Sequence, residues 1–182
     1  MLSRILATFA TIALAVPVLA QEAPAPTDAA PTESKAPLIA EVKSAEGTSL
    51  GTATANETPS GVMLITIELT GLAAGIHGLH IHETGTCTPP DFESAGGHLA
   101  GDKEHGVMST NGPHPGDLPN IHVPDSGELT VEFFATGLTS QMIADEDGSA
   151  IVIHEQPDDY VGQPSGHAGN RLGCGTFAAA TE

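Results

Sequence analysis

Residues 62–69 read "VMLITIEL" and place an apolar side chain at every second position. One face of this segment would carry Met63, Ile65, Ile67 and Leu69. Alternation with a period of two is typical of a β-strand that has one face in a core and the other toward solvent. The segment "ELTVEFF", residues 128–134, repeats the pattern. Together the two segments predict a fold made of β-strands.

Five further segments have the composition of short strands: "PLIAEVKS" (37–44), "GTSLGTATA" (47–55), "GIHGLHIHE" (75–83), "SAIVIHE" (149–155) and "RLGCGTFAA" (171–179). The chain has 21 glycines and 14 prolines, enough for many turns. About seven or eight short strands joined by such turns predict an all-β antiparallel sandwich or barrel. Two stretches poor in apolar residues, 83–123 and 155–170, interrupt the strands. Long irregular stretches in a compact domain are usually functional, so we expect two functional loops.

The charge of the chain excludes two classes of partner. The formal net charge is -18, and the cations are few: Arg4, Lys35, Lys43, Lys103 and Arg171. Nucleic acid and anionic membrane surfaces repel such an acidic chain. We therefore expect neither as a partner.

The first twenty residues, "MLSRILATFATIALAVPVLA", have the features of a secretory signal. Arg4 supplies the positive start, residues 5–18 are largely apolar, and Ala20 ends a segment of the cleavage-site type. A membrane anchor is the alternative, but the apolar run is short for a hydrocarbon core of about 30 Å. Residues 21–37 are rich in Ala and Pro and predict a linker, and residues 38–182 form the expected folded domain.

The chain has two cysteines, Cys87 and Cys174. If the protein is exported, an oxidising compartment favours one disulfide between them. Such a bond would contribute about 2–4 kcal/mol of stability by restricting the unfolded chain. Two unpaired buried thiols are the alternative.

The segment "LHIHE", residues 79–83, carries two histidines one residue apart. In a strand, Leu79 and Ile81 would face one way, and His80 and His82 the other. The pair taken alone is equally consistent with two surface histidines. The segment "SAIVIHE" strengthens the metal interpretation, because His154 is placed opposite its apolar neighbours in the same way. Three imidazoles on strands suit Cu(II).

The first irregular stretch contains "GGHLAGDKEHGVMSTNGPHPGDLP", residues 96–119. It brings His98, His105, His114 and Asp117 close together in the sequence. Three imidazoles and a carboxylate form the tetrahedral set of N and O ligands that zinc accepts. Each residue alone could be a solvated loop residue or a turn cap. Two metal sites explain the set of histidines better.

The same histidines carry a family resemblance. The motifs are "HGLHIHE" (77–83), "GGH" (96–98), "EHG" (104–106), "GPHPGDLPN" (112–120), "VIHEQPDDY" (152–160) and "GHAGNRLGCG" (166–175). With these motifs, the chain from about Leu38 to Ala180 resembles a copper/zinc superoxide dismutase of the bacterial secreted type. The resemblance implies a Greek-key sandwich or flattened barrel of about eight strands, and a periplasmic location.

The resemblance also implies one copper and one zinc ion per subunit. The copper ligands would be His80, His82, His98 and His154. The zinc ligands would be His98, His105, His114 and Asp117. His98 would bridge the two ions as an imidazolate.

Three further roles follow from the resemblance. Asp158 would be the carboxylate that links histidine ligands of the two sites and orients them. Cys87 and Cys174 would form the disulfide within the subunit. Arg171 would be the active-site arginine. Arg171 is also notable without the family, because it is the only cation after Lys103 and lies three residues before Cys174. An ordinary surface arginine is the alternative.

The implied activity is conversion of superoxide to O2 and H2O2, with copper cycling between Cu(II) and Cu(I), a structural zinc and His98 carrying a proton. The resemblance is compatible with a monomer or a homodimer that has no membrane association after signal removal. A metal-buffering protein without turnover and an immunoglobulin-like interaction module with incidental histidines are the alternatives.

Three histidines are not expected to bind metal. His77 would lie on the face opposite His80 and have a structural, hydrogen-bonding role, and His122 and His167 are assigned to no ion. No lysine lies between His154 and Arg171. The cationic rim that steers substrate in eukaryotic relatives is therefore not expected here.

Overall fold

The computed structural model describes residues 35–180. Nine β-strands lie in this range: β1 Leu38–Ser44, β2 Ser49–Glu57, β3 Met63–Leu69, β4 Gly75–His82, β5 Asp117–Val123, β6 Leu129–Ala135, β7 Ala150–His154, β8 Arg171–Thr176 and β9 Ala178–Ala179. The same residues contain a 3-10 turn, η1 Glu93–Ala95, and one short helix, α1 Ser140–Ile143. The described helices include none with the length and apolar character needed to cross a membrane.

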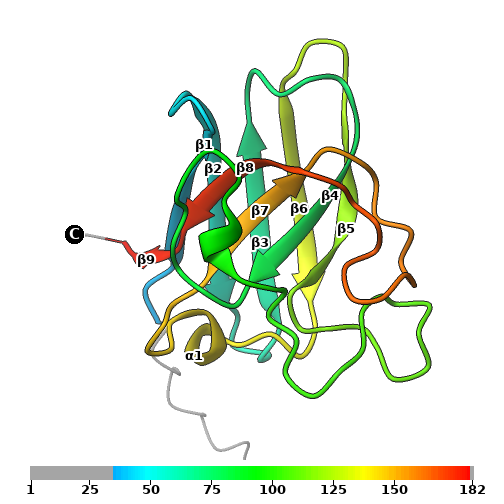
Figure 1. Cartoon of the computed structure of the whole chain (residues 1–182). Coiled ribbons are helices and arrows are strands. Elements are labelled where there is room, and N and C mark those ends of the chain that lie inside the picture. The colour runs from blue at the N-terminus through cyan, green and yellow to red at the C-terminus, as the bar shows by residue number, and fades with distance from the viewer. Residues whose placement is uncertain (1–34, 181–182) are drawn as a thin grey trace, which may run out of the picture. The chain divides into compact units, whose positions relative to one another are not determined.

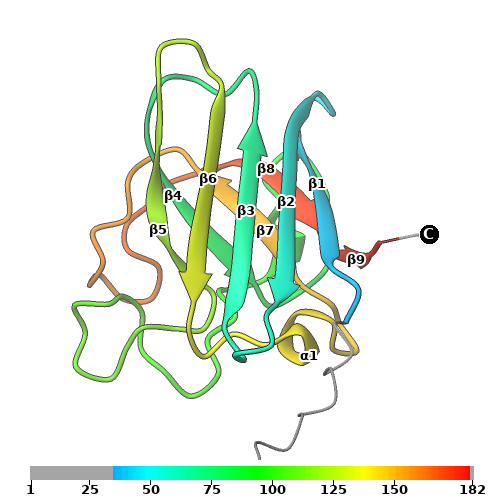
Figure 2. The ribbon, with the colours of Figure 1, turned by 180° about the vertical axis from the view of Figure 1, so that it is seen from behind.

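The strands form one antiparallel sheet that curls into a nearly closed barrel (Figures 1 and 2). Neighbours in the sheet follow the order β5-β4-β7-β8-β1-β2-β3-β6, and the short β9 pairs with β1. β5 and β6, at the two ends of this order, lie near each other. Because β3 pairs with β6 and β4 with β7, the connections cross as in a Greek key. The predicted all-β antiparallel fold is confirmed.

The interior of the barrel is filled with aliphatic side chains. On β3 the residues predicted to share a face are all buried. Ile65 lies opposite Phe133 and Ile67 opposite Val131 on the neighbouring β6, so apolar side chains meet across the strands. Burial of each such side chain contributes about 1.5–3 kcal/mol. The chain thus obtains its core from Ile, Leu and Val, as its 3% aromatic content requires.

β4 and β7 differ from β3 because their last residues are buried on both faces. Leu79 and Ile81 belong to the core inside the barrel. His80, His82 and His154 point to the other face, as the alternation predicts, and are nevertheless buried. The loops 83–116 and 155–170 cover this outer face, since carbonyl groups of both loops reach the histidine rings.

The structure differs from the sequence prediction at β5. The seven residues of this strand belong to the stretch 83–123, which we expected to be irregular. The buried residues of β5 are Leu118, Ile121 and Val123, so their spacing is three and then two. The pairing of β4 with β5 shifts between His77 and Leu79, and this irregularity explains why no clean alternation marks the strand.

Two predicted segments involve residues that the structure does not describe. The predicted signal, residues 1–20, lies wholly outside the described range, and the predicted linker, residues 21–37, lies mostly outside it. Both therefore stay predictions. The first described strand begins at Leu38.

Candidate metal centre

Two neighbouring strands and one loop supply the first group of histidines. β4 carries His80 and His82, and β7 carries His154. The two strands pair so that His80 lies opposite Val152 and His82 opposite Ala150. The loop histidine His98 joins them through an isolated β-bridge with His82. Backbone pairing therefore holds all four residues on the outer face of the sheet.

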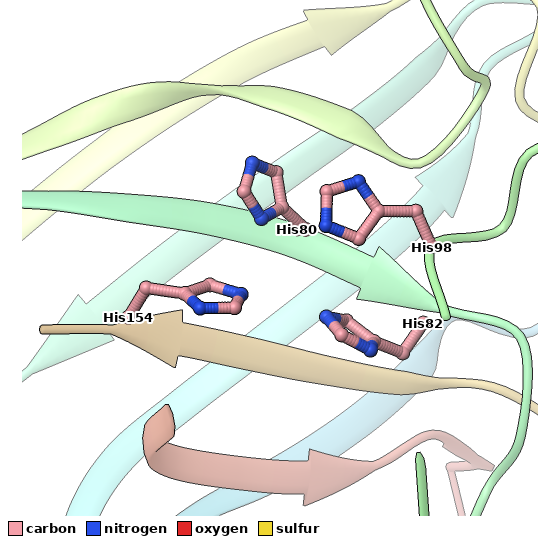
Figure 3. Close-up of side chains that lie close together, drawn as sticks. All are labelled: His80, His82, His98 and His154. Atoms are coloured by element: carbon pink, nitrogen blue, oxygen red, sulfur yellow. The ribbon is translucent and has the colours of Figure 1, made fainter. Parts of the chain in front are cut away.

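One nitrogen of each of these rings is buried without a hydrogen-bond partner. The atoms are Nδ1 of His80 and Nε2 of His82, His98 and His154. Four nitrogen atoms, one from each ring, lie within 4.8 Å of one another, and the rings face a common centre in Figure 3. An unpaired polar atom in the interior costs free energy, and four that converge need a common partner. A metal ion with imidazole ligands fits this arrangement.

The opposite nitrogen of three of these rings is held by hydrogen bonds. His82 Nδ1 donates to the carbonyl of Gly96 at 3.0 Å, and His154 Nδ1 to the carbonyl of Gly169 at 3.3 Å. His80 Nε2 lies 2.8 Å from Oδ2 of Asp158. A proton fixed on one ring nitrogen leaves the lone pair of the other free to bind a metal ion.

The second group gathers around Asp117 at the start of β5. Its Oδ1 lies 2.9 Å from Nδ1 of His98, 3.0 Å from Nδ1 of His105 and 3.1 Å from Nδ1 of His114. Its Oδ2 accepts hydrogen bonds from the backbone nitrogens of Gly106 and His114. Three imidazole nitrogens around one carboxylate oxygen are the ligand types of a zinc site.

Glycine at position 106 allows the loop that carries His105 to come close to Tyr160 and Asp117. Its φ is +90°, and a Cβ there would overlap the carbonyl of Tyr160. The backbone nitrogen of Gly106 can then approach the Asp117 carboxylate to 2.8 Å. The glycine thus brings the loop that carries His105 against the second covering loop.

His98 belongs to both groups. Its Nδ1 faces Asp117 in the second group, and its unpaired Nε2 faces the first. The centroids of the His80 and His98 rings are 4.0 Å apart. The two groups therefore share one imidazole.

Asp158 links the groups a second time. Its Oδ2 lies against His80, and its Oδ1 lies 3.0 Å from Nε2 of His105. The backbone around Asp158 is held by Asn120, whose side chain donates to the Asp158 carbonyl and accepts from the Asp158 nitrogen at 2.8 Å. We did not predict a role for Asn120. No sequence signal singles it out, because its contact spans 38 residues and depends on β5.

Burial keeps His82, His154 and His98 neutral. It lowers the pKa of His82 to about 2 and that of His154 to about 3, with neighbouring histidines adding to the effect. Burial also lowers the pKa of His98 to about 4, against the hydrogen bond with Asp117. Neutral imidazoles are the form that binds metal ions.

The carboxylates reverse this effect at His105. Burial lowers the pKa of His105, but hydrogen bonds with Asp117 and Asp158 outweigh it and raise the pKa to about 9. Both carboxylates have pKa values well below the usual range, because hydrogen bonds, first among them those with His105, outweigh the effect of burial. In the metal-free protein at neutral pH, His105 is an imidazolium between two carboxylates.

Arg171 lies at the start of β8 beside the first group. Its Nη1 donates to the carbonyl of Phe92 at 2.6 Å, and its Nη2 donates to the carbonyl of Gly96 at 2.8 Å. His82 uses the same Gly96 carbonyl. Burial lowers the pKa of the guanidinium, against the nearby Glu93 and Asp91. Arg171 therefore keeps its charge in a half-buried position next to the histidines.

A disulfide between Cys87 and Cys174 joins the first covering loop to β8, across 87 residues of sequence. The predicted pairing is present, and the two free thiols are excluded. Cys174 packs with Phe92 in a small apolar cluster on the outer face of the sheet. The bond thus holds the Phe92 carbonyl near Arg171.

The remaining histidines belong to neither group. Ring nitrogens of His77 lie 2.8 Å from the carbonyl of His154 and 3.0 Å from that of Ala73, which agrees with the predicted structural role. His122 is exposed on β5. His167 is also exposed and pairs with Asp159 at 2.8 Å.

The comparisons with known proteins agree on one family. A family model described as copper/zinc superoxide dismutase matches residues 49–177. Copper/zinc superoxide dismutase 1 of Aquifex aeolicus is 41% identical over 143 residues, 75% of this chain and 84% of that protein. The copper/zinc superoxide dismutase of Caulobacter vibrioides is 40% identical over 144 residues, 75% of this chain and 82% of that protein.

A solved structure is similar as well. The crystal structure of a superoxide dismutase-like protein from Bacillus subtilis matches with a TM-score of 0.73 and 40% sequence identity. The match covers 77% of this chain and 97% of that chain.

Proposed function

The chain belongs to the copper/zinc superoxide dismutase family, and from that membership we propose how its own residues convert superoxide to O2 and H2O2. The family is one of oxidoreductases, and the relatives from Aquifex aeolicus and Caulobacter vibrioides are named for this reaction. The reaction consumes two superoxide anions and two protons, and gives one O2 and one H2O2. The protein must therefore attract an anion, exchange one electron at a time and deliver protons.

We assign copper to the first group, with Nδ1 of His80 and Nε2 of His82, His98 and His154 as ligand atoms. The observation that supports this most strongly is the convergence of these four buried, unpaired nitrogens. We assign zinc to Nδ1 of His98, His105 and His114 and to Asp117. Each chain would hold one copper and one zinc ion.

Bound copper supplies the one-electron couple, and zinc, which has no accessible redox chemistry, supplies charge and structure. We propose that His98 would offer one ring nitrogen to each ion, and that its Nε2, when released from copper, would carry a proton to the product. Nε2 suits this role, because it faces the first group while Nδ1 stays on the zinc side.

Arg171 would attract superoxide and position it beside the histidines. Its two hydrogen bonds to backbone carbonyls fix the plane of the guanidinium without neutralising its charge. Because it shares the Gly96 carbonyl with His82, an anion held by Arg171 would lie next to the first group. A point charge fixed in this way stabilises charge on the substrate without reorganisation.

We also propose that the protein is exported to the periplasm after removal of residues 1–20. The signal-like sequence and the disulfide support export. Sedimentation of the metal-loaded protein would distinguish the monomer from the homodimer.

Metal analysis combined with a superoxide assay tests the proposal. The mature chain, loaded with both ions, should contain one copper and one zinc and should remove superoxide much faster than the same amount of free copper. His154→Asn should lose copper and activity, whereas His122→Asn, which changes an exposed histidine outside both groups, should keep both. A wild-type rate no higher than that of free copper would refute the proposed function.

A further inference from the structure

A cavity of about 390 Å³ opens beside Arg171, and its walls carry more negative than positive charge. It is lined by Pro90, Asp91, Glu93, Gly169, Asn170 and Arg171. Arg171 is the one cation among these residues, and both carboxylates are exposed. An anion that reaches Arg171 through this cavity therefore comes close to two negative charges as well.

The backbone fixes the two carboxylates near the guanidinium. Asp91 and Glu93 flank Phe92, whose side chain is buried and whose carbonyl accepts the hydrogen bond from Arg171 at 2.6 Å. Oδ1 of Asp91 accepts a hydrogen bond from the backbone nitrogen of Glu93 at the start of η1. In Figure 1 this loop runs alongside β8, the strand that begins at Arg171.

The carboxylates are close enough to act on Arg171 but do not neutralise it. Both favour the charged form of the guanidinium through space. Among residues 35–180, the hydrogen bonds of the Arg171 side chain go to carbonyl groups, and it forms no salt bridge. The charges of Asp91 and Glu93 therefore act freely on a third ion in the cavity.

The residues that line the cavity include no cation other than Arg171 to compensate for them. Asn170, which also lines the cavity, donates to the carboxylate of Glu155 at 2.9 Å, and this adds a third negative charge nearby. Lys43 lines a different cavity, with Cys87 and Phe92, and pairs with Glu41 at 2.9 Å. The cavity beside Arg171 is thus acidic apart from Arg171 itself.

Building on the proposed function, we infer that Asp91 and Glu93 limit the rate at which superoxide reaches Arg171. Charges within about 10 Å of an approaching ion act with little screening at moderate salt, so local charges control its encounter rate. Two carboxylates at the cavity raise the free energy of the anion before Arg171 can attract it. Added salt screens this repulsion, so kcat/KM of the wild-type protein should rise with ionic strength at low salt.

The test compares two double variants that change the net charge equally. Asp91→Asn/Glu93→Gln removes the two cavity charges, and asparagine keeps the oxygen that accepts from the backbone of residue 93. Asp125→Asn/Glu128→Gln removes two exposed charges from the turn between β5 and β6. All proteins are loaded with both metals, and their metal content and thermal unfolding are measured. The readout is kcat/KM for superoxide from about 10 mM to about 500 mM ionic strength.

The cavity variant should exceed the wild type in kcat/KM by about threefold or more at low salt, and the difference should shrink as salt is added. The turn variant should stay within about 1.5-fold of the wild type, because its charges lie outside the cavity. Equal effects of the two variants, or a cavity variant no faster than the wild type, would overturn the inference while the proposed function stands. A wild-type protein without dismutation at any salt would instead overturn the proposed function.

Discussion

Nε2 of His105 lies 3.0 Å from Oδ1 of Asp158, whereas Nδ1 of the same ring faces Asp117. The other oxygen of Asp158 lies 2.8 Å from Nε2 of His80 in the first group. One carboxylate therefore receives an N–H from each group and fixes the tautomer of both rings. The two histidine groups are connected through this side chain as well as through His98.

Replacement of Asp158 should weaken both sites together. In Asp158→Asn, an uncharged amide replaces the carboxylate, and it offers only one oxygen to the two N–H donors. Loss of such an outer partner typically lowers metal affinity about 10–100-fold. Competition with a chelator would measure the affinity for copper and for zinc separately.

The neighbouring Asp159 provides the control for this prediction. Asp159→Asn removes the same charge, but its partner is the exposed His167. Both affinities should stay close to those of the wild type. Loss of affinity for only one ion in Asp158→Asn would show that the carboxylate does not couple the sites.

Zinc uptake should release a proton at neutral pH. The pKa of His105 is raised to about 9 in the metal-free protein, so its imidazole carries both protons at pH 7. Zinc requires the lone pair on Nδ1, whereas Nε2 can keep its proton toward Asp158. Calorimetric titration in two buffers of different ionisation enthalpy should show about one proton released per zinc from this residue.

The number of protons released per zinc should fall as the pH rises. As the pH rises through about 9, His105 loses its proton before zinc binds, and the release from this residue falls toward zero. Release that is absent at pH 7, or that grows between pH 7 and pH 9, would contradict an imidazolium at position 105.

The sequence predicts the strands that carry His80, His82 and His154 better than the segments around them. Alternation placed His80, His82 and His154 opposite the core, because period-two patterns follow directly from strand geometry. The same reasoning missed β5, where a register shift breaks the alternation. It also missed Asn120, since contacts between distant loops depend on the closed barrel rather than on any local pattern. The sequence itself grouped His80, His82 and His154, and separately grouped the loop histidines with Asp117. Only the sharing of His98 between the groups and the role of Asp158 came from the family resemblance.

Acid should destabilise the metal-free protein. His82 and His154 have folded pKa values of about 2 and about 3, below the unfolded value of about 6.5. Below pH 6.5 the unfolded chain therefore binds more protons, and stability falls as the pH falls. Between pH 7 and pH 5 each of these residues should cost about 2 kcal/mol of unfolding free energy.

Urea unfolding of the metal-free protein at pH 7 and pH 5 measures this loss. His105 offsets only a minor part of it, about 1 kcal/mol, because the stability contributed by its raised pKa is mostly present at pH 7 and becomes complete below pH 6.5. Asp117 and Asp158 also leave it unchanged, since their depressed pKa values matter only at lower pH. Equal or greater stability at pH 5 would contradict neutral, buried histidines in the first group.

Glycine at position 166 should be required for the link between the two sites. Its φ is +68°, and a Cβ there would overlap the Asp158 carboxylate and lie 2.6 Å from Nε2 of His105. Gly166→Ala should therefore strain the backbone and also displace Asp158 from the two histidines. We expect a loss of about 1–3 kcal/mol in unfolding free energy and weaker binding of both metals.

The variant Gly47→Ala separates the backbone strain from the displacement of Asp158. The φ of Gly47 is +81°, but a Cβ there would have no atom within 4 Å. Gly47→Ala should thus show a backbone cost of about 1–2 kcal/mol and unchanged metal affinity. If both variants lose stability but neither loses metal affinity, then the position of Asp158 does not depend on the space left by Gly166. If only Gly166→Ala binds copper and zinc more weakly, then the absence of a Cβ at position 166 keeps the Asp158 carboxylate in place.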